Sequence, residues 1–212
     1  DLATRKKIVL IFDECTSGFR RNLGGMHMTQ KIYPDLCMFG KALGNGYAIS
    51  AVIGRKNIMK KANGSFISST FWTERVGYLA ALKTLETMNK EKSWKKIVQY
   101  GNYLNSEWKK LAFKYKLKMG ISGIESITSF NFESKNNLKY KTFISQEMLK
   151  KGVLASNTVF LTVFHNKKVI DEYIKKLDPI FSKIKKFETV NKNYKFLDGP
   201  VCHTSFKRLN DD

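Results

Sequence analysis

The sequence predicts an α/β fold in which a mostly parallel sheet with helices is followed by a smaller α+β unit. Residues 8–13 form a continuous apolar run that ends in an acid, as is typical of a strand covered on both faces. Short apolar runs and helical patterns then alternate as far as residue 116. Beyond that point, short strand patterns surround two amphipathic stretches. We place the domain boundary between residues 110 and 111.

Periodicity predicts the elements of the first domain, residues 1–110, in order. After the first strand come a loop at 14–34, strands at 35–40 and 47–54, a short helix at 55–62, and helices at 74–88 and 92–116. The helix at 74–88 has an apolar side made of Val76, Leu79, Ala80, Leu82 and Leu85. Gly101 lies inside the next helix, which we expect to be bent or broken there because glycine weakens a helix interior.

The second domain, residues 111–212, has a different pattern of predicted strands and helices. It is predicted to contain one or two strands at 121–132, a helix at 140–151, short strands at 153–155 and 158–164, and a helix at 169–187. The helix at 140–151 should bury Phe143, Met148 and Leu149 and end at Gly152. This mixture indicates a small α+β domain.

The formal net charge of +20 is compatible with a nucleic-acid partner or another anionic partner. The cations are mostly lysines, however, and they are spread along the whole chain. Nucleic-acid modules favour arginine, which reads and stacks on bases better than lysine does. We therefore interpret the charge as a solvated, lysine-rich surface and expect no nucleic-acid partner.

The cysteines and histidines show no spacing typical of a metal or redox motif. They are Cys15, Cys37, Cys202, His27, His165 and His203. An odd number of unpaired cysteines favours a reducing cytoplasm, and scattered histidines predict no metal site. No apolar run approaches the roughly 20 residues of a membrane helix, so we expect no membrane association.

Two segments place an acid and an amine directly after consecutive predicted strands. Asp13 ends the first strand, and Lys41 follows the apolar run Leu-Cys-Met-Phe-Gly at residues 36–40. Open α/β sheets bind ligands at the carboxyl ends of their strands. A lysine forms a Schiff base with pyridoxal 5'-phosphate (PLP), and a carboxylate keeps the ring nitrogen of PLP protonated. The pair predicts a PLP site with Asp13 and Lys41 as its catalytic residues.

The surrounding residues suit such a coenzyme. Gly44 and Gly46 allow a tight turn after the lysine. Ser68, Ser69 and Thr70 precede the helix predicted from Glu74, and hydroxyls with backbone amides near a helix start suit a phosphate.

In their order along the chain and in their amino-acid sequences, these segments resemble the class III aminotransferases, a family of fold-type I PLP enzymes that includes the glutamate-1-semialdehyde aminomutases. The segments are Ile-Phe-Asp-Glu-Cys-Thr-Ser-Gly-Phe-Arg at 11–20, Tyr-Pro-Asp-Leu-Cys-Met-Phe-Gly-Lys-Ala-Leu-Gly-Asn-Gly at 33–46, and shorter stretches at 69–72, 155–157 and 161–165. The resemblance covers nearly the whole chain, and its specific motifs lie in the first half.

The resemblance implies a role for each candidate residue. Asp13 would bind the pyridine nitrogen, and Lys41 would form the internal aldimine and move the proton of the reaction. Thr70 would reach the phosphate of a coenzyme in the neighbouring subunit of a homodimer. Cys15 stands where the family usually has valine, so we expect it to pack on the coenzyme ring.

The same resemblance implies amino-group transfer between a small-molecule amino donor and a carbonyl acceptor, or migration of the amine within one substrate. The family's phosphate-binding loop and ring-stacking aromatic residue lie well before the aspartate, and the sequence has no place for them. We therefore expect an N-terminally truncated chain that is inactive alone. The alternative is a non-catalytic basic or dimerisation module, a relic of a PLP enzyme.

Overall fold

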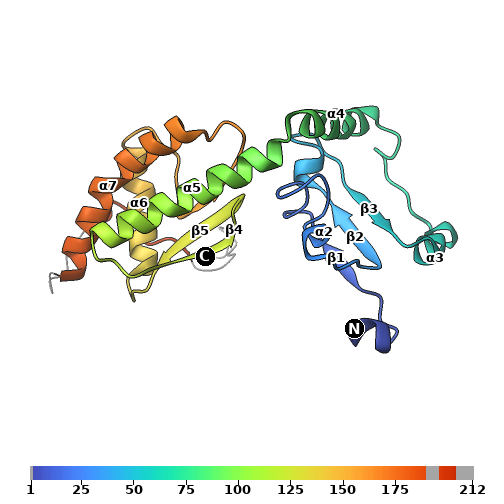
Figure 1. The fold of residues 1–212 in the computed structure, drawn as a ribbon, viewed down its shortest axis with the longest axis horizontal. Helices are drawn as coiled ribbons and strands as arrows, with labels where there is room; N and C mark the ends of the chain where they lie inside the picture. The colour runs from blue at the N-terminus through green and yellow to red at the C-terminus, as the bar shows by residue number, and fades with distance from the viewer. Residues whose placement is uncertain (1, 190–195, 204–212) are drawn as a thin grey trace. The chain divides into compact units, whose positions relative to one another are not determined.

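The computed structural model describes residues 2–189 and 196–203, which fall into two compact units, Asp1–Val98 and Gln99–Asp212 (Figure 1). The division lies inside the helix α5, which runs over Ser93–Lys114. Each unit has its own sheet of three strands.

The first unit is built around the sheet β1-β2-β3. Its elements are α1 (Leu2–Arg5), β1 (Ile11–Asp13), α2 (His27–Gln30), β2 (Leu36–Phe39), η1 (Lys41–Leu43), β3 (Ala51–Gly54), α3 (Lys56–Met59), η2 (Lys60–Gly64) and α4 (Arg75–Glu91). Strands β1 and β2 are parallel, and β3 runs antiparallel to β2. The parallel pair brings the carboxyl ends of β1 and β2 to the same edge of the sheet.

Strand β1 is shorter than the predicted strand at 8–13. The backbone N–H of Leu10 donates to Asp35 Oδ2 at 2.8 Å, and Asp35 also forms an ion pair with Arg55 at 3.1 Å. The Leu10 amide is therefore bound to a side chain, and regular pairing begins at Ile11, opposite Leu36.

The core of the first unit is small and lies between β2 and α4. Cys37, Phe39, Leu43 and Ala81 are buried, with Phe12, Phe19, Ile49, Ala51 and Leu85 packed against them. Helix α4 begins where it was predicted, and Glu74 caps it by accepting from the backbone amides of Val76 and Gly77.

Many apolar side chains of the first unit lie on its surface. Val76, Leu79 and Leu82 of α4 are more than half exposed, although the periodicity of the sequence predicts an inward face there. Ile11, Val52 and Ile53 of the sheet are also about half exposed. The apolar sequence at 8–13 predicts a strand covered on both faces, but the described residues do not cover both faces of β1.

Helix α5 is continuous, and the bend or break predicted at Gly101 is wrong. A Cβ at Gly101 would overlap the backbone carbonyl of Glu125, which lies between β4 and β5. This glycine allows the helix to pack closely against the hairpin, although a glycine in a helix interior is less favourable than alanine.

The second unit packs two further helices against an antiparallel sheet of order β4-β5-β6. Its elements after α5 are β4 (Met119–Ile124), β5 (Ile127–Phe132), α6 (Asn137–Leu149), β6 (Thr158–Phe160) and α7 (Lys167–Thr189). The core is aromatic: Phe130 lies 4.7 Å from Trp108 and 5.8 Å from Phe181 between ring centroids. The predicted α+β character of this part is present.

Several local predictions in the second unit are wrong. The strand predicted at 158–164 ends at Phe160. Leu149 is 63% exposed, because it lies one residue beyond Met148 and so turns away from the buried stripe of α6. Residues 153–155 form no strand, because the amide of Val153 closes the end of α6 by donating to Met148 O at 3.0 Å. The helix ends at Leu149 with Lys150 as its C-cap, so the C-cap predicted at Gly152 is two residues too late; Gly152 follows in a left-handed conformation.

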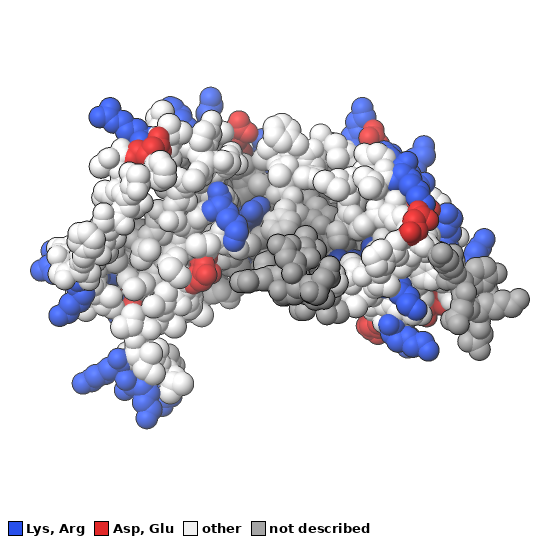
Figure 2. All heavy atoms as spheres, turned by 180° about the vertical axis from the view of Figure 1, so that it is seen from behind, with Lys and Arg blue, Asp and Glu red and all other residues white. Residues whose placement is uncertain are grey.

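Lysine and arginine side chains are scattered over the face shown in Figure 2, with few acidic residues between them. None of the described helices combines the length and the apolarity needed to cross a membrane.

Candidate active site

The two residues predicted to be catalytic lie at one edge of the first sheet. Asp13 ends β1 and pairs in register with Met38, three residues before Lys41. Gly40 follows β2, and Lys41 opens the short helix η1. The parallel pairing therefore places an acid and an amine on neighbouring strand ends.

Asp13 is held as a carboxylate by the start of the following loop. Its Oδ1 accepts from the backbone N–H of Cys15 at 3.0 Å. This bond, a further one from the Cys15 side chain and the positive charge of Lys41 lower the pKa of Asp13 below its usual value. An anionic group at this place is the type of group that holds a proton on a pyridine nitrogen.

Lys41 has an unusual backbone conformation. Its φ of 39° lies in the left-handed region, which is uncommon for a residue with a side chain. Such conformations concentrate at functional sites, where the surrounding structure enforces them. The side chain is exposed, and Nζ donates to Thr16 Oγ1 at 2.5 Å. Lys41 thus reaches back to the loop that follows Asp13.

Cys15 lies between these two strand ends. Its Sγ is 3.6 Å from the position that a Cβ on Gly40 would occupy. A hydrogen bond to Asp13, together with burial, raises the pKa of the Cys15 thiol above its usual value. A neutral, half-buried thiol is a packing surface rather than a nucleophile.

Thr70 is not part of this hydrogen-bonded group. It is exposed in the turn between η2 and α4, and no hydrogen bond among the described residues joins it to Asp13, Cys15 or Lys41. The structure therefore brings together three of the four residues predicted to bind the coenzyme.

A buried cluster beside this edge is not predicted by the sequence. Glu14, only 4% exposed, accepts from the backbone amide of His27 at 2.9 Å, from that of Met26, and from Ser17 Oγ at 3.2 Å. Its Oε1 also lies 2.7 Å from His27 Nδ1, which is 3.7 Å from Cys37 Sγ. The spacing of the three residues along the chain gives no sign of this meeting, which depends on the path of the loop.

The titration of this cluster is shifted by its surroundings. Burial raises the pKa of Glu14, but the hydrogen bonds from the amides of His27 and Met26 outweigh it, and the net shift is downward. Burial, followed by the charge of Glu14, raises the pKa of Cys37 to about 11. Glu14 is therefore an anion and Cys37 a neutral thiol at neutral pH.

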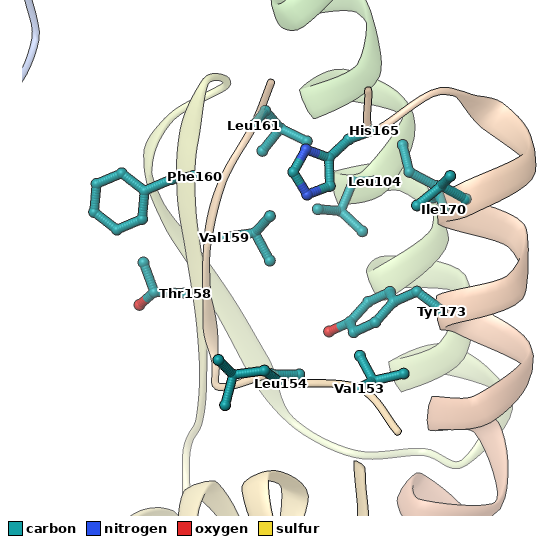
Figure 3. A pocket seen from close by; sticks show the side chains of 12 residues that line it. Leu104, Val153, Leu154, Thr158, Val159, Phe160, Leu161, His165, Ile170 and Tyr173 are labelled. Atoms are coloured by element: carbon teal, nitrogen blue, oxygen red, sulfur yellow. The ribbon is translucent and has the colours of Figure 1, made fainter. Parts of the chain in front are cut away.

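A separate cavity of about 270 Å³ lies within the second unit, between the 153–161 segment, α5 and α7 (Figure 3). Its wall is mostly apolar, and the Tyr173 hydroxyl and the His165 ring face it. Tyr173 accepts from Trp108 Nε1 at 3.3 Å, and burial raises its pKa. None of the predicted site residues lines this cavity.

Curated relatives match the chain over most of its length. It is 31% identical over 167 residues to the 3-aminobutyryl-CoA aminotransferase of Cloacimonas acidaminovorans, covering 78% of this chain and 40% of that protein. It is 26% identical over 198 residues to the glutamate-1-semialdehyde 2,1-aminomutase of Methanocaldococcus jannaschii, covering 85% and 46%. The chain thus spans less than half the length of these relatives.

Solved structures share the fold. The PLP internal aldimine form of the FumI protein from Sphingopyxis sp. MTA144 superposes with a TM-score of 0.80 at 22% identity, over 90% of this chain and 47% of that one. An ornithine delta-aminotransferase from Plasmodium falciparum gives a TM-score of 0.73 at 20% identity, over 87% and 49%. The α/β expectation from the sequence is confirmed by this likeness.

A family model described as aminotransferase class-III matches residues 1–184, which is most of the chain. PLP is the coenzyme of this enzyme family, as the sequence predicts. The chain belongs to the class III aminotransferase family.

Proposed function

We propose that this chain takes part in PLP-dependent amino-group transfer, as an aminotransferase or an aminomutase, with Lys41 as the residue that holds the coenzyme. The observation that carries the proposal is the meeting of Asp13 and Lys41 at one sheet edge, joined through residues 13–16. The substrates are a small amino donor and a carbonyl acceptor, or a single molecule that contains both groups.

The residues of this edge supply the kinds of group that the two ends of a pyridoxal ring require. PLP, when bound, supplies a ring that withdraws electrons from a substrate carbon as that carbon loses a proton. Asp13 stabilises positive charge on the ring nitrogen, which its anionic state allows. Lys41 Nζ would hold the coenzyme and would carry the proton between carbons. Cys15 would pack against the coenzyme.

The remaining contacts belong to parts that this chain does not span, because it covers 40% and 46% of the two relatives described above. We propose that they include the main phosphate-binding loop and the group on the other ring face. Thr70 binds the phosphate of a coenzyme held by a neighbouring subunit, and its exposure in the turn before α4 is consistent with such a contact. The chain alone is then inactive in turnover.

The exposed apolar side chains of the first unit support assembly into a homodimer or a larger protein. Ile11, Val52, Ile53, Leu79 and Leu82 are all about half exposed or more. Surfaces of this kind mark interaction sites. They equally suit a dimerisation module without catalysis, which is the alternative function. The three free cysteines favour a reducing compartment, and we propose the cytoplasm.

Covalent trapping tests the role of Lys41. The purified chain is exposed briefly to PLP and reduced with borohydride, and labelled lysines are located by peptide mass spectrometry. We expect Lys41 to be labelled faster than the exposed lysines Lys31 and Lys56. Asp13→Asn should slow labelling at Lys41 alone, while Glu86→Gln, at a remote exposed ion pair, should have no effect.

Equal labelling of Lys41, Lys31 and Lys56, unaffected by Asp13→Asn, would contradict the proposal. It would favour the alternative function, a dimerisation module without catalysis. Amino transfer from an amine to pyruvate or 2-oxoglutarate by the chain alone would contradict its predicted inactivity.

A further inference from the structure

The cluster of Glu14, His27 and Cys37 has the geometry of a metal site that no sequence spacing predicts. One ligand atom from each residue lies within 4.8 Å of the other two. The carboxylate comes from the loop start after β1, the imidazole from α2, and the thiol from β2. The side chains of His27 and Glu14 are only 10% and 5% exposed, and Cys37 is 3% exposed.

The distance between the nitrogen and the sulfur suits a zinc-type ion. Zinc bonds to imidazole nitrogen at about 2.0–2.1 Å and to thiolate sulfur at about 2.3 Å, so a tetrahedral angle separates those two atoms by roughly 3.6 Å. His27 Nδ1 and Cys37 Sγ are 3.7 Å apart. Nδ1 and Glu14 Oε1 are 2.7 Å apart and would have to separate by roughly 0.7 Å, because the metal replaces the proton between them.

Glu14 is oriented for this role by contacts that a metal leaves in place. Its Oε2 accepts from the Met26 amide and from Ser17 Oγ, and its Oε1 accepts from the His27 amide. Only the lone pair of Oε1 that faces Nδ1 is needed for the ion. Outer contacts that fix a ligand in this way are typical of metal sites.

The charges also balance. Metal binding would displace the proton of the neutral Cys37 thiol to solvent. The Glu14 carboxylate and the resulting thiolate then offset a divalent cation, and a neutral imidazole adds nothing, so the occupied cluster has no net charge. This matters in a buried place, where an unpaired charge is costly. A ligand set of oxygen, nitrogen and sulfur selects zinc over magnesium or calcium, which prefer oxygen alone.

We propose that Glu14, His27 and Cys37 bind a zinc-type divalent ion, with water as the fourth ligand, and that this ion links the loop after Asp13 to the strand that leads to Lys41. The site is independent of the coenzyme and of the proposed amino transfer. Its effect is to fix the path of residues 14–27 and so the edge at which Asp13 and Lys41 meet.

Cobalt is the probe that tests the site. Metal-free chain is titrated anaerobically with Co²⁺, and absorption is followed in the near ultraviolet, where thiolate–cobalt charge transfer appears, and in the visible, where tetrahedral cobalt absorbs. We expect one equivalent to produce both bands and Zn²⁺ to remove them by displacement. Cys37→Val replaces the thiol by an apolar side chain one heavy atom larger and should abolish the charge-transfer band, and His27→Ala should weaken cobalt binding by at least about 100-fold.

Matched controls come from the rest of the chain. Cys15→Ser, Cys202→Ser and His165→Ala remove a thiol or an imidazole elsewhere and should leave both bands unchanged. Lys41→Ala should also leave them unchanged, which separates this test from that of the amino-transfer proposal. A charge-transfer band that survives in folded Cys37→Val, or one-equivalent cobalt binding that is absent from the unmodified chain, overturns the metal site.

Discussion

Lys41 Nζ donates to Thr16 Oγ1 at 2.5 Å, and this bond links the residue after β2 to the loop after β1. The same loop binds Asp13 through the amide of Cys15 at 3.0 Å. The acid and the amine are thus held by one short segment, residues 13–16. The segment orients both groups before any coenzyme arrives.

Thr16→Val should accelerate the reaction of Lys41 with PLP. The hydroxyl accepts from the protonated amine, and that hydrogen bond must break before the nitrogen attacks an aldehyde. Its loss is worth about 0.5–1.5 kcal/mol, or about 2- to 10-fold in the rate of borohydride-trapped labelling at Lys41. Thr29→Val is the control, because the Thr29 hydroxyl donates only to Met26 O in its own turn. Labelling slowed by Thr16→Val would mean that the bond positions Lys41 productively.

The edge of the sheet was predictable because Asp13 and Lys41 directly follow apolar runs. Local sequence therefore locates both residues, and the parallel pairing of β1 and β2 brings them together. The cluster at His27 was not predictable in this way. Its ring is placed by hydrogen bonds that Glu14 accepts from backbone amides within the loop. Every residue except proline has such an amide, so neither composition nor spacing indicates these contacts.

Leu79→Gln and Leu82→Gln should reduce self-association of the chain without destabilising it. Both side chains are about 60% exposed on α4, so their removal exposes little new surface and should change the free energy of unfolding by less than about 0.5 kcal/mol. Light scattering and denaturant unfolding measure the two effects. Leu85→Gln is the contrasting variant, since Leu85 packs on the core and its replacement should destabilise the first unit.

The contrast between predicted and observed faces of α4 has a physical origin. Periodicity identifies the apolar stripe of Leu79, Leu82 and Leu85 but not what lies against it. The described residues supply a cover for Leu85 alone among these three. A helix pattern therefore predicts that a face will be buried, while the partner that buries it depends on the rest of the assembly.

Gly101→Ala should destabilise the second unit even though alanine favours helix. A methyl group at this position overlaps the backbone carbonyl of Glu125, which belongs to a tight hairpin and cannot move freely. We expect the overlap to cost about 1–3 kcal/mol, of which the gain in helix propensity offsets about 0.5–1 kcal/mol, so the net change is a destabilisation. Unfolding followed by the fluorescence of buried Trp108 measures it. Asn102→Ala, at the next, exposed position, should be neutral or slightly stabilising.

Gly101 also shows why sequence alone mislocated a break in α5. Inside a helical pattern, a glycine that breaks a helix and one that admits a neighbouring backbone look the same. The difference depends on the β4–β5 hairpin, whose turn at Glu125 and Ser126 lies more than 20 residues further along the chain.

The stability of the second unit should fall as the pH drops from about 5 towards 2, because of Glu147. Burial raises the pKa of this carboxyl, but hydrogen bonds from Lys150, Lys183 and Gln146 outweigh it and lower the pKa to about 2. A folded-state pKa below the unfolded value stabilises the fold above the unfolded pKa, and this contribution is lost as the pH falls through the folded one. The Glu147 side chain is 13% exposed, and allowing for screening by solvent we expect it to contribute about 1–2 kcal/mol to the free energy of unfolding.

Glu147→Gln should therefore destabilise the unit by that amount at pH 7 and by much less at pH 2.5, as measured by urea unfolding at both pH values. Glu86→Gln removes an exposed partner of Lys83 and should show little effect at either pH. An equal loss at both pH values for Glu147→Gln would assign its effect to packing and not to charge.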